Sequence, residues 1–182
     1  MTGDGTQGNL TSADTSVSAD GRYVAFDSLA SNLVPGDRTG TWDVFVHDRD
    51  TGTIERVSLA ADGSAASPGV SQEPSISADG RYVAFLSAAS NLVPGDTNGT
   101  GDVFVHDRVS GTNERVSVAS DGSEGDLFSE QPSISADGRY VAFDSQATNL
   151  VPVPGDTNFD ADVFVRDRNA GVPHPKQVTE VR

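Results

Sequence analysis

The sequence predicts an all-β protein, a β-propeller with three four-stranded blades per chain. Two observations lead to this fold class. Nearly the same segment occurs three times, and each copy contains four short apolar stretches separated by turn residues. No stretch shows a helical period. A four-stranded antiparallel unit repeated along a chain is typical of propeller blades, because a single blade cannot bury both of its faces.

Three motifs define the repeats. Ser-Ala-Asp-Gly-Arg-Tyr-Val-Ala-Phe occurs at 18–26, 77–85 and 135–143. Asn-Leu-Val-Pro begins at 32, 91 and 149, and Asp-Val-Phe-Val begins at 43, 102 and 162, so the period is 58 to 60 residues. These positions predict one propeller domain with a connector at 1–15 and blades at 16–70, 71–128 and 129–182.

The second repeat shows how each blade is expected to be built. A tight turn at 78–81 uses Gly80 for a positive φ, and a second hairpin turn lies at 109–112. A long loop at 88–101 joins the middle strands, and a polar connector at 120–131 leads to the next blade. The four predicted strands are Pro74–Ser77, Tyr82–Ser87, Asp102–Asp107 and Glu114–Ala119.

The motif at 77–85, followed by Asp-Val-Phe-Val-His-Asp-Arg at 102–108, resembles the repeat of the TolB-like (WD-like) β-propeller family. The resemblance extends over about residues 12–182 and implies a propeller that commonly has six blades. It leaves the activity open, since such propellers host many functions. Three blades alone would leave two apolar faces open. We therefore expect two chains to join head to tail as a homodimeric six-bladed ring. The alternative is that the sequence is a piece of a longer propeller.

Composition limits the partners. A net charge of −15, from 27 acidic and 12 basic residues, argues against nucleic acid and anionic membranes and favours cations. The absence of cysteine excludes disulfides and thiolate metal sites. No apolar run is long enough to span a bilayer. The polar N-terminus has no signal-peptide pattern, which leaves open both a cytosolic location and export after removal of a signal peptide.

The long loops suggest calcium. The second and third repeats carry Asp-x-Asn-x-x-x-Asp, and calcium takes about six to eight oxygen ligands in flexible geometry. In the first repeat a threonine replaces the asparagine and an arginine follows the first aspartate, so weak binding or none is expected there. Turn formation and loop capping by the same residues are the alternative. The candidate ligands are Asp96, Asn98, Asp102, Asp156, Asn158 and Asp162, with Asp37 and Asp43 in the first repeat.

A second candidate site lies at the propeller axis. The first strand of each blade lines the channel, and Asp14, Glu73 and Gln131 are expected just before it, at the channel mouth. A ring of such oxygens suits a second Ca²⁺. In architecture this resembles the paraoxonase-type propeller hydrolases, whose calcium polarises a phosphoryl or lactone oxygen. In such an enzyme Glu73 and Glu130 would be the catalytic carboxylates.

Two functions follow from these sites. The first is a calcium-binding propeller that acts as a binding or scaffold module, with an unknown small molecule or protein at the channel mouth. The alternative is a calcium-dependent hydrolase of phosphotriesters or lactones. No Gly-x-Ser-x-Gly, phosphate-binding loop or dinucleotide fingerprint is present to favour another enzyme class.

Overall fold

The computed structural model describes residues 5, 7–37, 40–151, 160–168 and 178–181. These residues form three four-stranded antiparallel sheets, each a simple meander, and include no helix that could cross a membrane. The all-β class and the four-stranded repeat unit are therefore confirmed. The strands are β1 (Ser12–Val17), β2 (Tyr23–Ser28), β3 (Asp43–Asp48), β4 (Ile54–Arg56), β5 (Ser71–Ile76), β6 (Tyr82–Ser87), β7 (Asp102–Asp107), β8 (Thr112–Arg115), β9 (Ser129–Ile134), β10 (Tyr140–Ser145), β11 (Asp162–Asp167) and β12 (Val178–Val181).

The middle strands of the second blade have the predicted bounds, and its outer strands do not. β5 begins at Ser71 and not at Pro74, because a β-bulge within it keeps the chain paired with β6 on both sides. β8 ends at Arg115, before the predicted end at Ala119, because Val118 pairs with Glu124 in a small separate bridge. In the first blade, β1 begins at Ser12, inside the segment assigned to the connector.

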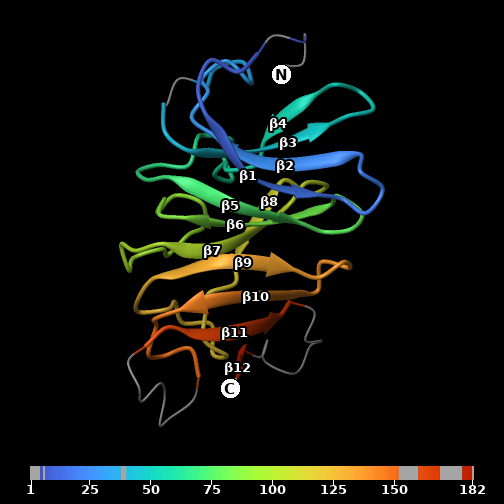
Figure 1. The fold of residues 1–182 in the computed structure, drawn as a ribbon. Coiled ribbons are helices and arrows are strands. Elements are labelled where there is room, and N and C mark those ends of the chain that lie inside the picture. Colours follow the sequence, from blue (N-terminus) through green and yellow to red (C-terminus); the bar gives the residue numbers. More distant parts are fainter. Residues whose placement is uncertain (1–4, 6, 38–39, 152–159, 169–177, 182) are drawn as a thin grey trace.

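The core lies between the sheets, which stack one on another from the N-terminal to the C-terminal blade (Figure 1). On the face toward the next blade, each blade carries valine and alanine side chains. These pack against valine and phenylalanine side chains of that next blade. Phe85 and Phe104 of the second blade thus pack in one cluster with Val44 and Val46 of the first. The strict Val-Phe-Val alternation sends these side chains to opposite faces, so both faces of the middle blade are buried.

A second contact between blades involves the tight turns. The ring of Tyr23 lies against Gly80 of the next blade. The guanidinium of Arg108 stacks over the same ring, with Cζ 4.3 Å from the ring centroid. Tyr82 makes the same contact with Gly138 and Arg168, at 4.5 Å. The turn glycines have φ of 74° and 72°, a region where a side chain is strained. Glycine is therefore needed for the turn and also for the tyrosine that packs against it.

The repeated Asp-Arg pairs belong to a structural charge network. Asp107 accepts two hydrogen bonds from Arg81, at 3.0 and 2.8 Å, and the first and third blades repeat the pair. Arg81 holds the pKa of Asp107 well below its usual range. Because the arginine of each pair is exposed to solvent, such a pair stabilises the fold only weakly.

Candidate functional site

The first strand of every blade contains a bulge at the same position. Asp14, Glu73 and Gln131 have φ of 25°, 57° and 54°, and no other described residue except glycine has a positive φ. The pairing register shifts at each of these places. Pro74 and Pro132 follow two of them, which suits a bulge because proline has no N–H to give to the ladder. Strained backbone of this kind gathers at functional sites.

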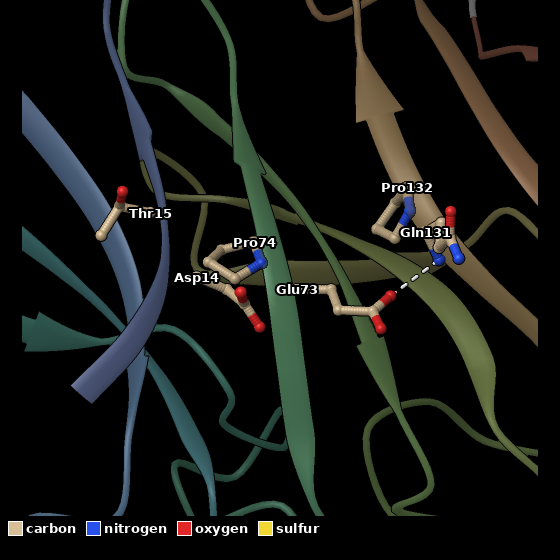
Figure 2. Close-up of a pocket in the computed structure, with 6 residues that line it drawn as sticks. All are labelled: Asp14, Thr15, Glu73, Pro74, Gln131 and Pro132. Carbon is tan, nitrogen blue, oxygen red and sulfur yellow. Dashed lines mark hydrogen bonds between the residues drawn. The ribbon is translucent and has the colours of Figure 1, made fainter. Parts of the chain in front are cut away.

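The three bulges open onto one pocket of about 370 Å³. The first strands of neighbouring blades lie side by side, β1 with β5 and β5 with β9. Figure 2 shows the side chains reaching the opening from three successive strands, with Glu73 in the middle. The sequence predicted that the bulge residues lie just before the first strand of each blade. The structure places them within that strand. The lining residues are Asp14, Thr15, Glu73, Pro74, Gln131 and Pro132.

Hydrogen bonds through Glu73 link the three blades. Its Oε2 accepts from the backbone N–H of Gln131 at 2.7 Å (Figure 2). Its own backbone N–H donates to Oδ2 of Asp27 on β2 at 3.2 Å. The positive φ of Glu73 turns this N–H away from the ladder and toward the preceding blade. Glu73 is thus held between a carboxylate of the first blade and the backbone of the third.

Asp27 is a member of the site that sequence reasoning missed. Its side chain has no exposed surface, and Oδ1 has no hydrogen-bond partner. Burial raises the pKa of Asp27 to about 6, and the charges of Asp14 and Glu73 add to the shift. The signal was a charged residue in the otherwise apolar β2 motif. It is easily overlooked, because the second repeat has Leu86 at this position.

The carboxylates around the pocket repel one another. Burial raises the pKa of Glu73, and so do the charges of Glu130, Asp14 and Asp144. Glu130 lies half-buried on β9, opposite Asp144 on β10, and does not line the pocket. The structure therefore places the predicted acid pair Glu73 and Glu130 on neighbouring strands, with only Glu73 at the opening. A positive ligand would relieve this repulsion.

The acidic loop of the second repeat surrounds an arginine. Nη1 of Arg115 lies 3.2 Å from Asp96, 3.4 Å from Asp102 and 2.8 Å from Glu124. Asn98 donates through its amide nitrogen to Asp102 at 2.9 Å, so it is the amide N–H that faces the carboxylate. In the first repeat, Arg56 lies 3.3 Å from Asp37 and 3.5 Å from Asp43. In these two loops a guanidinium thus contacts the carboxylate oxygens that were predicted to bind calcium.

The third repeat differs at this point. Asp156 and Asn158 lie outside the described residues, and Asp162 begins β11. In the strand register Glu180 stands opposite Phe164, where Arg115 stands opposite Phe104 in the second blade. The arginine that serves the first two loops is thus absent from the corresponding position. Within the described ranges, no group of three or more His, Asp or Glu side chains is arranged to hold a metal ion.

Replacing Asp27 by asparagine is expected to raise the free energy of unfolding at pH 7 by about 3 kcal/mol, measured by urea unfolding with chelator present. The pKa of Asp27 in the folded protein, about 6, lies above the ordinary aspartate value of 3.8. The contribution of Asp27 to the free energy of unfolding is therefore largest below about pH 4, where the carboxyl group is protonated in both states. It is lost as the pH rises through about 6, because the unfolded state gives up this proton first. The variant should lack this slope. An exposed control, Asp50→Asn, should keep it, and equal slopes in Asp27→Asn and wild type would contradict the assignment.

Comparison with known proteins identifies the fold. No family model and no curated protein sequence matches the chain. A putative TolB from Agrobacterium tumefaciens superposes with a TM-score of 0.57 at 20% identity, over 94% of this chain and 49% of that one. The tricorn protease gives 0.54 at 17% identity, over 91% of this chain and 14% of that one. A prolyl endopeptidase superposes with a TM-score of 0.52 at 15% identity, over 95% of this chain and 22% of that one.

Together with the stacked four-stranded sheets, these similarities show that the chain has the TolB-like β-propeller fold. The chain spans about half the length of the TolB protein it matches. The similar structures include a TolB protein as well as peptidases, so the fold by itself does not specify an activity.

Proposed function

We propose that this chain is a propeller binding module whose inner-strand pocket takes a cation, with Ca²⁺ as the ion that its oxygen donors suit. One observation carries the proposal. Three successive blades use the same strained bulge to bring Asp14, Glu73 and Gln131 to one opening, beside the buried carboxylate of Asp27. Strand pairing alone does not require such strain, so its repetition points to a ligand.

The electrostatics of the pocket support a positive ligand. The pKa values of Asp27 and Glu73 are raised by burial and by neighbouring negative charges. A bound cation would stabilise both carboxylates and join donors from three blades. The described side chains do not by themselves form a complete metal site. Three of them supply fewer oxygens than the about six to eight that calcium takes, so water or further propeller strands would have to complete the shell.

Calcium titration by calorimetry at pH 7.5 tests the proposal. We expect binding to weaken by about tenfold or more in Glu73→Gln and in Asp14→Asn, because each removes a charged donor. Asp50→Asn, which removes an equal charge at an exposed turn away from the pocket, should bind as wild type does. Absence of binding heat with wild-type protein, or equal loss in the control, would refute the calcium site.

Binding should also depend on pH. The cation competes with protons on Asp27 and Glu73, so affinity should fall as the pH drops through about 6. Between pH 7.5 and pH 5 we expect a loss of about tenfold in wild type, since Asp27 is then largely protonated. In Asp27→Asn the pH dependence should be clearly smaller. A wild-type affinity that is unchanged at pH 5 would contradict this account of the site.

A second calcium site is proposed in the loop of the third repeat, with Asp156, Asn158 and Asp162 as ligands. Two observations support it: the loop keeps the Asp-x-Asn-x-x-x-Asp pattern, and the register puts Glu180 where the other blades have an arginine. Asp156→Asn should reduce the rise in melting temperature that calcium produces. Asp96→Asn should leave this rise unchanged.

The hydrolase alternative is favoured by one observation, the raised pKa of Glu73 and Asp27 within a pocket. It is tested with a chromogenic phosphotriester and a chromogenic lactone, each with and without chelator. The binding proposal expects no chelator-sensitive turnover. Turnover that is abolished by Glu73→Gln or Glu130→Gln in a folded protein would instead support the enzyme.

A further inference from the structure

The two ends of the blade stack carry the two halves of the contact that joins neighbouring blades. Inside the chain, a tyrosine of one blade packs against the turn glycine and the arginine of the next blade. We propose that two copies of the chain associate head to tail, so that Tyr140 of one copy packs against Gly21 and Arg49 of the second. The proposal does not depend on calcium binding.

The receiving turn of the first blade is already formed. Gly21 has a φ of 72°, matching Gly80 and Gly138. Arg49 donates from Nη1 to the carbonyl oxygen of Gly21 at 2.8 Å, as Arg108 and Arg168 do to the two other turn glycines. A side-chain carbon added at Gly21 would meet only Arg49, at 3.6 Å. At Gly80 and Gly138 the same carbon would come within 2.1 Å of a tyrosine ring. The turn of the first blade thus has the shape of the others without the ring.

The tyrosine at the other end is correspondingly open. Tyr140 is 40% exposed, whereas Tyr23 and Tyr82 are half-buried under the next blade. Tyr140 stacks with Arg139 of its own blade, as Tyr82 does with Arg81. The other face of the Tyr140 ring is the face that an arginine of a following blade would cover. Arg49 occupies the position equivalent to Arg108 and Arg168, so Arg49 of a second copy would cover that face.

The apolar faces at the two ends match in the same way. Val17 is 59% exposed, whereas Ile76, at the same position in the second blade, is 7% exposed against its neighbour. At the other end, Val163 is 41% exposed, whereas Val44 and Val103 are fully buried. Within the chain, Ile76 and Val44 belong to one core cluster. Valines 17 and 163 are thus the exposed members of a pair of positions that packs against the core wherever two blades meet.

Polar contacts between blades continue the series. The backbone N–H of Ile76 donates to Ser16 Oγ, and that of Ile134 donates to Ser75 Oγ, each at 3.1 Å. Ser133 is the residue of the third blade equivalent to Ser16 and Ser75, and Val17 of the first blade is equivalent to Ile76 and Ile134. In the proposed dimer, the backbone N–H of Val17 in a second copy would therefore donate to Ser133 Oγ. A partner of unrelated sequence would have to reproduce all these positions, whereas a second copy carries them already. Two such contacts close a ring of six blades with two-fold symmetry, within the range usual for propellers.

One internal contact has no counterpart at the ends. Arg108 pairs with Glu55, and Arg168 pairs with Glu114, at 3.2 Å in the latter case. In the register of the third blade, Thr179 stands opposite Val165, where these glutamates stand opposite Val46 and Val105. Arg49 would therefore find no carboxylate at that position of a second copy. We expect the interface between copies to be weaker than those between blades, with a dissociation constant of about 1 to 100 µM.

Sedimentation velocity of the 182-residue chain, from about 1 to 200 µM and with or without chelator, tests the proposal. We expect a reversible dimer whose mass does not change with chelator. Tyr140→Ala and Val17→Asp should each raise the dissociation constant by about tenfold or more. The control is Val109→Asp, an apolar residue that is 76% exposed on the β7–β8 turn, away from both end faces, and it should dimerise normally. Circular dichroism should show all variants folded.

Mixing variants distinguishes this interface from any other. A Val17→Asp chain mixed with a Val163→Lys chain retains one unchanged interface and brings opposite charges together at the other, so the mixture should dimerise better than either variant alone. A mass of one chain at every concentration overturns the proposal and would leave the ends to be covered by something other than a second copy. A dimer that is unaffected by Tyr140→Ala and Val17→Asp also overturns it, since it would use another surface. Neither result would bear on calcium binding at the pocket.

Discussion

Replacing Arg115 with leucine is expected to lower the free energy of unfolding by about 3 to 5 kcal/mol, the largest effect of any substitution considered. Nη1 of this arginine lies within 3.4 Å of three carboxylates, and only a tenth of its side chain is exposed. Burial raises the pKa of Asp102, and the arginine counters that shift. Without it, several negative charges would remain buried with no cation between them. Chemical denaturation at pH 7 measures the loss.

The matched control is Arg81→Leu, which removes an arginine paired with Asp107 near solvent. Its side chain is 42% exposed, so the loss should be far smaller than that of Arg115→Leu. Calcium should recover part of the stability of Arg115→Leu, because the emptied loop then offers the carboxylates of Asp96, Asp102 and Glu124. Wild type should show no such effect from this loop. Similar losses in the two arginine variants would contradict the view that Arg115 neutralises buried carboxylates.

Replacing Gly80 with alanine is expected to cost about 3 kcal/mol, because the added carbon would lie 2.1 Å from the ring of Tyr23. The ring fills the space between the first two blades under Arg108, so it cannot move aside without opening that contact. The positive φ of 74° adds strain of its own. The loss is measured by thermal or chemical unfolding of the purified variant.

Gly111→Ala separates the two causes of that loss. Gly111 has a φ of 70° in the β7–β8 turn, and an added carbon there would meet nothing within 4 Å. This control isolates the backbone strain, expected at about 1 kcal/mol. The difference between the two variants reports the contact between blades. Equal losses would mean that the tyrosine contact contributes little to stability.

The arginines in the loops change the interpretation of the acidic motif. The Asp-x-Asn-x-x-x-Asp pattern is compatible with a metal ion or with a side-chain cation, since both are bound by oxygen atoms. Arg115 comes 13 residues after Asp102 and reaches the loop from the adjacent strand. The first two blades thus use a built-in positive charge to hold the loop. Only the third repeat keeps the pattern without an arginine at that position.

The sequence by itself determined the repeat, the four-stranded unit and the middle strands. Three near-identical copies define the period, and alternation of valine and phenylalanine defines the faces of strands such as Asp102–Asp107. Equivalent positions in the repeats also singled out Asp14, Glu73 and Gln131. These features are local or periodic, so neighbouring residues along the chain specify them.

Only the tertiary structure decided what surrounds each charged residue. It placed Arg115 in the acidic loop, Asp27 beside Glu73, and the three bulges on one pocket. Each of these contacts joins residues of different strands or blades, and their energies depend on burial and on the distance between charges. A linear pattern specifies which residues are acidic or basic. The packing of one blade on the next determines which of them share the same low-dielectric space, and therefore which carboxylates are neutralised and which remain available to a ligand.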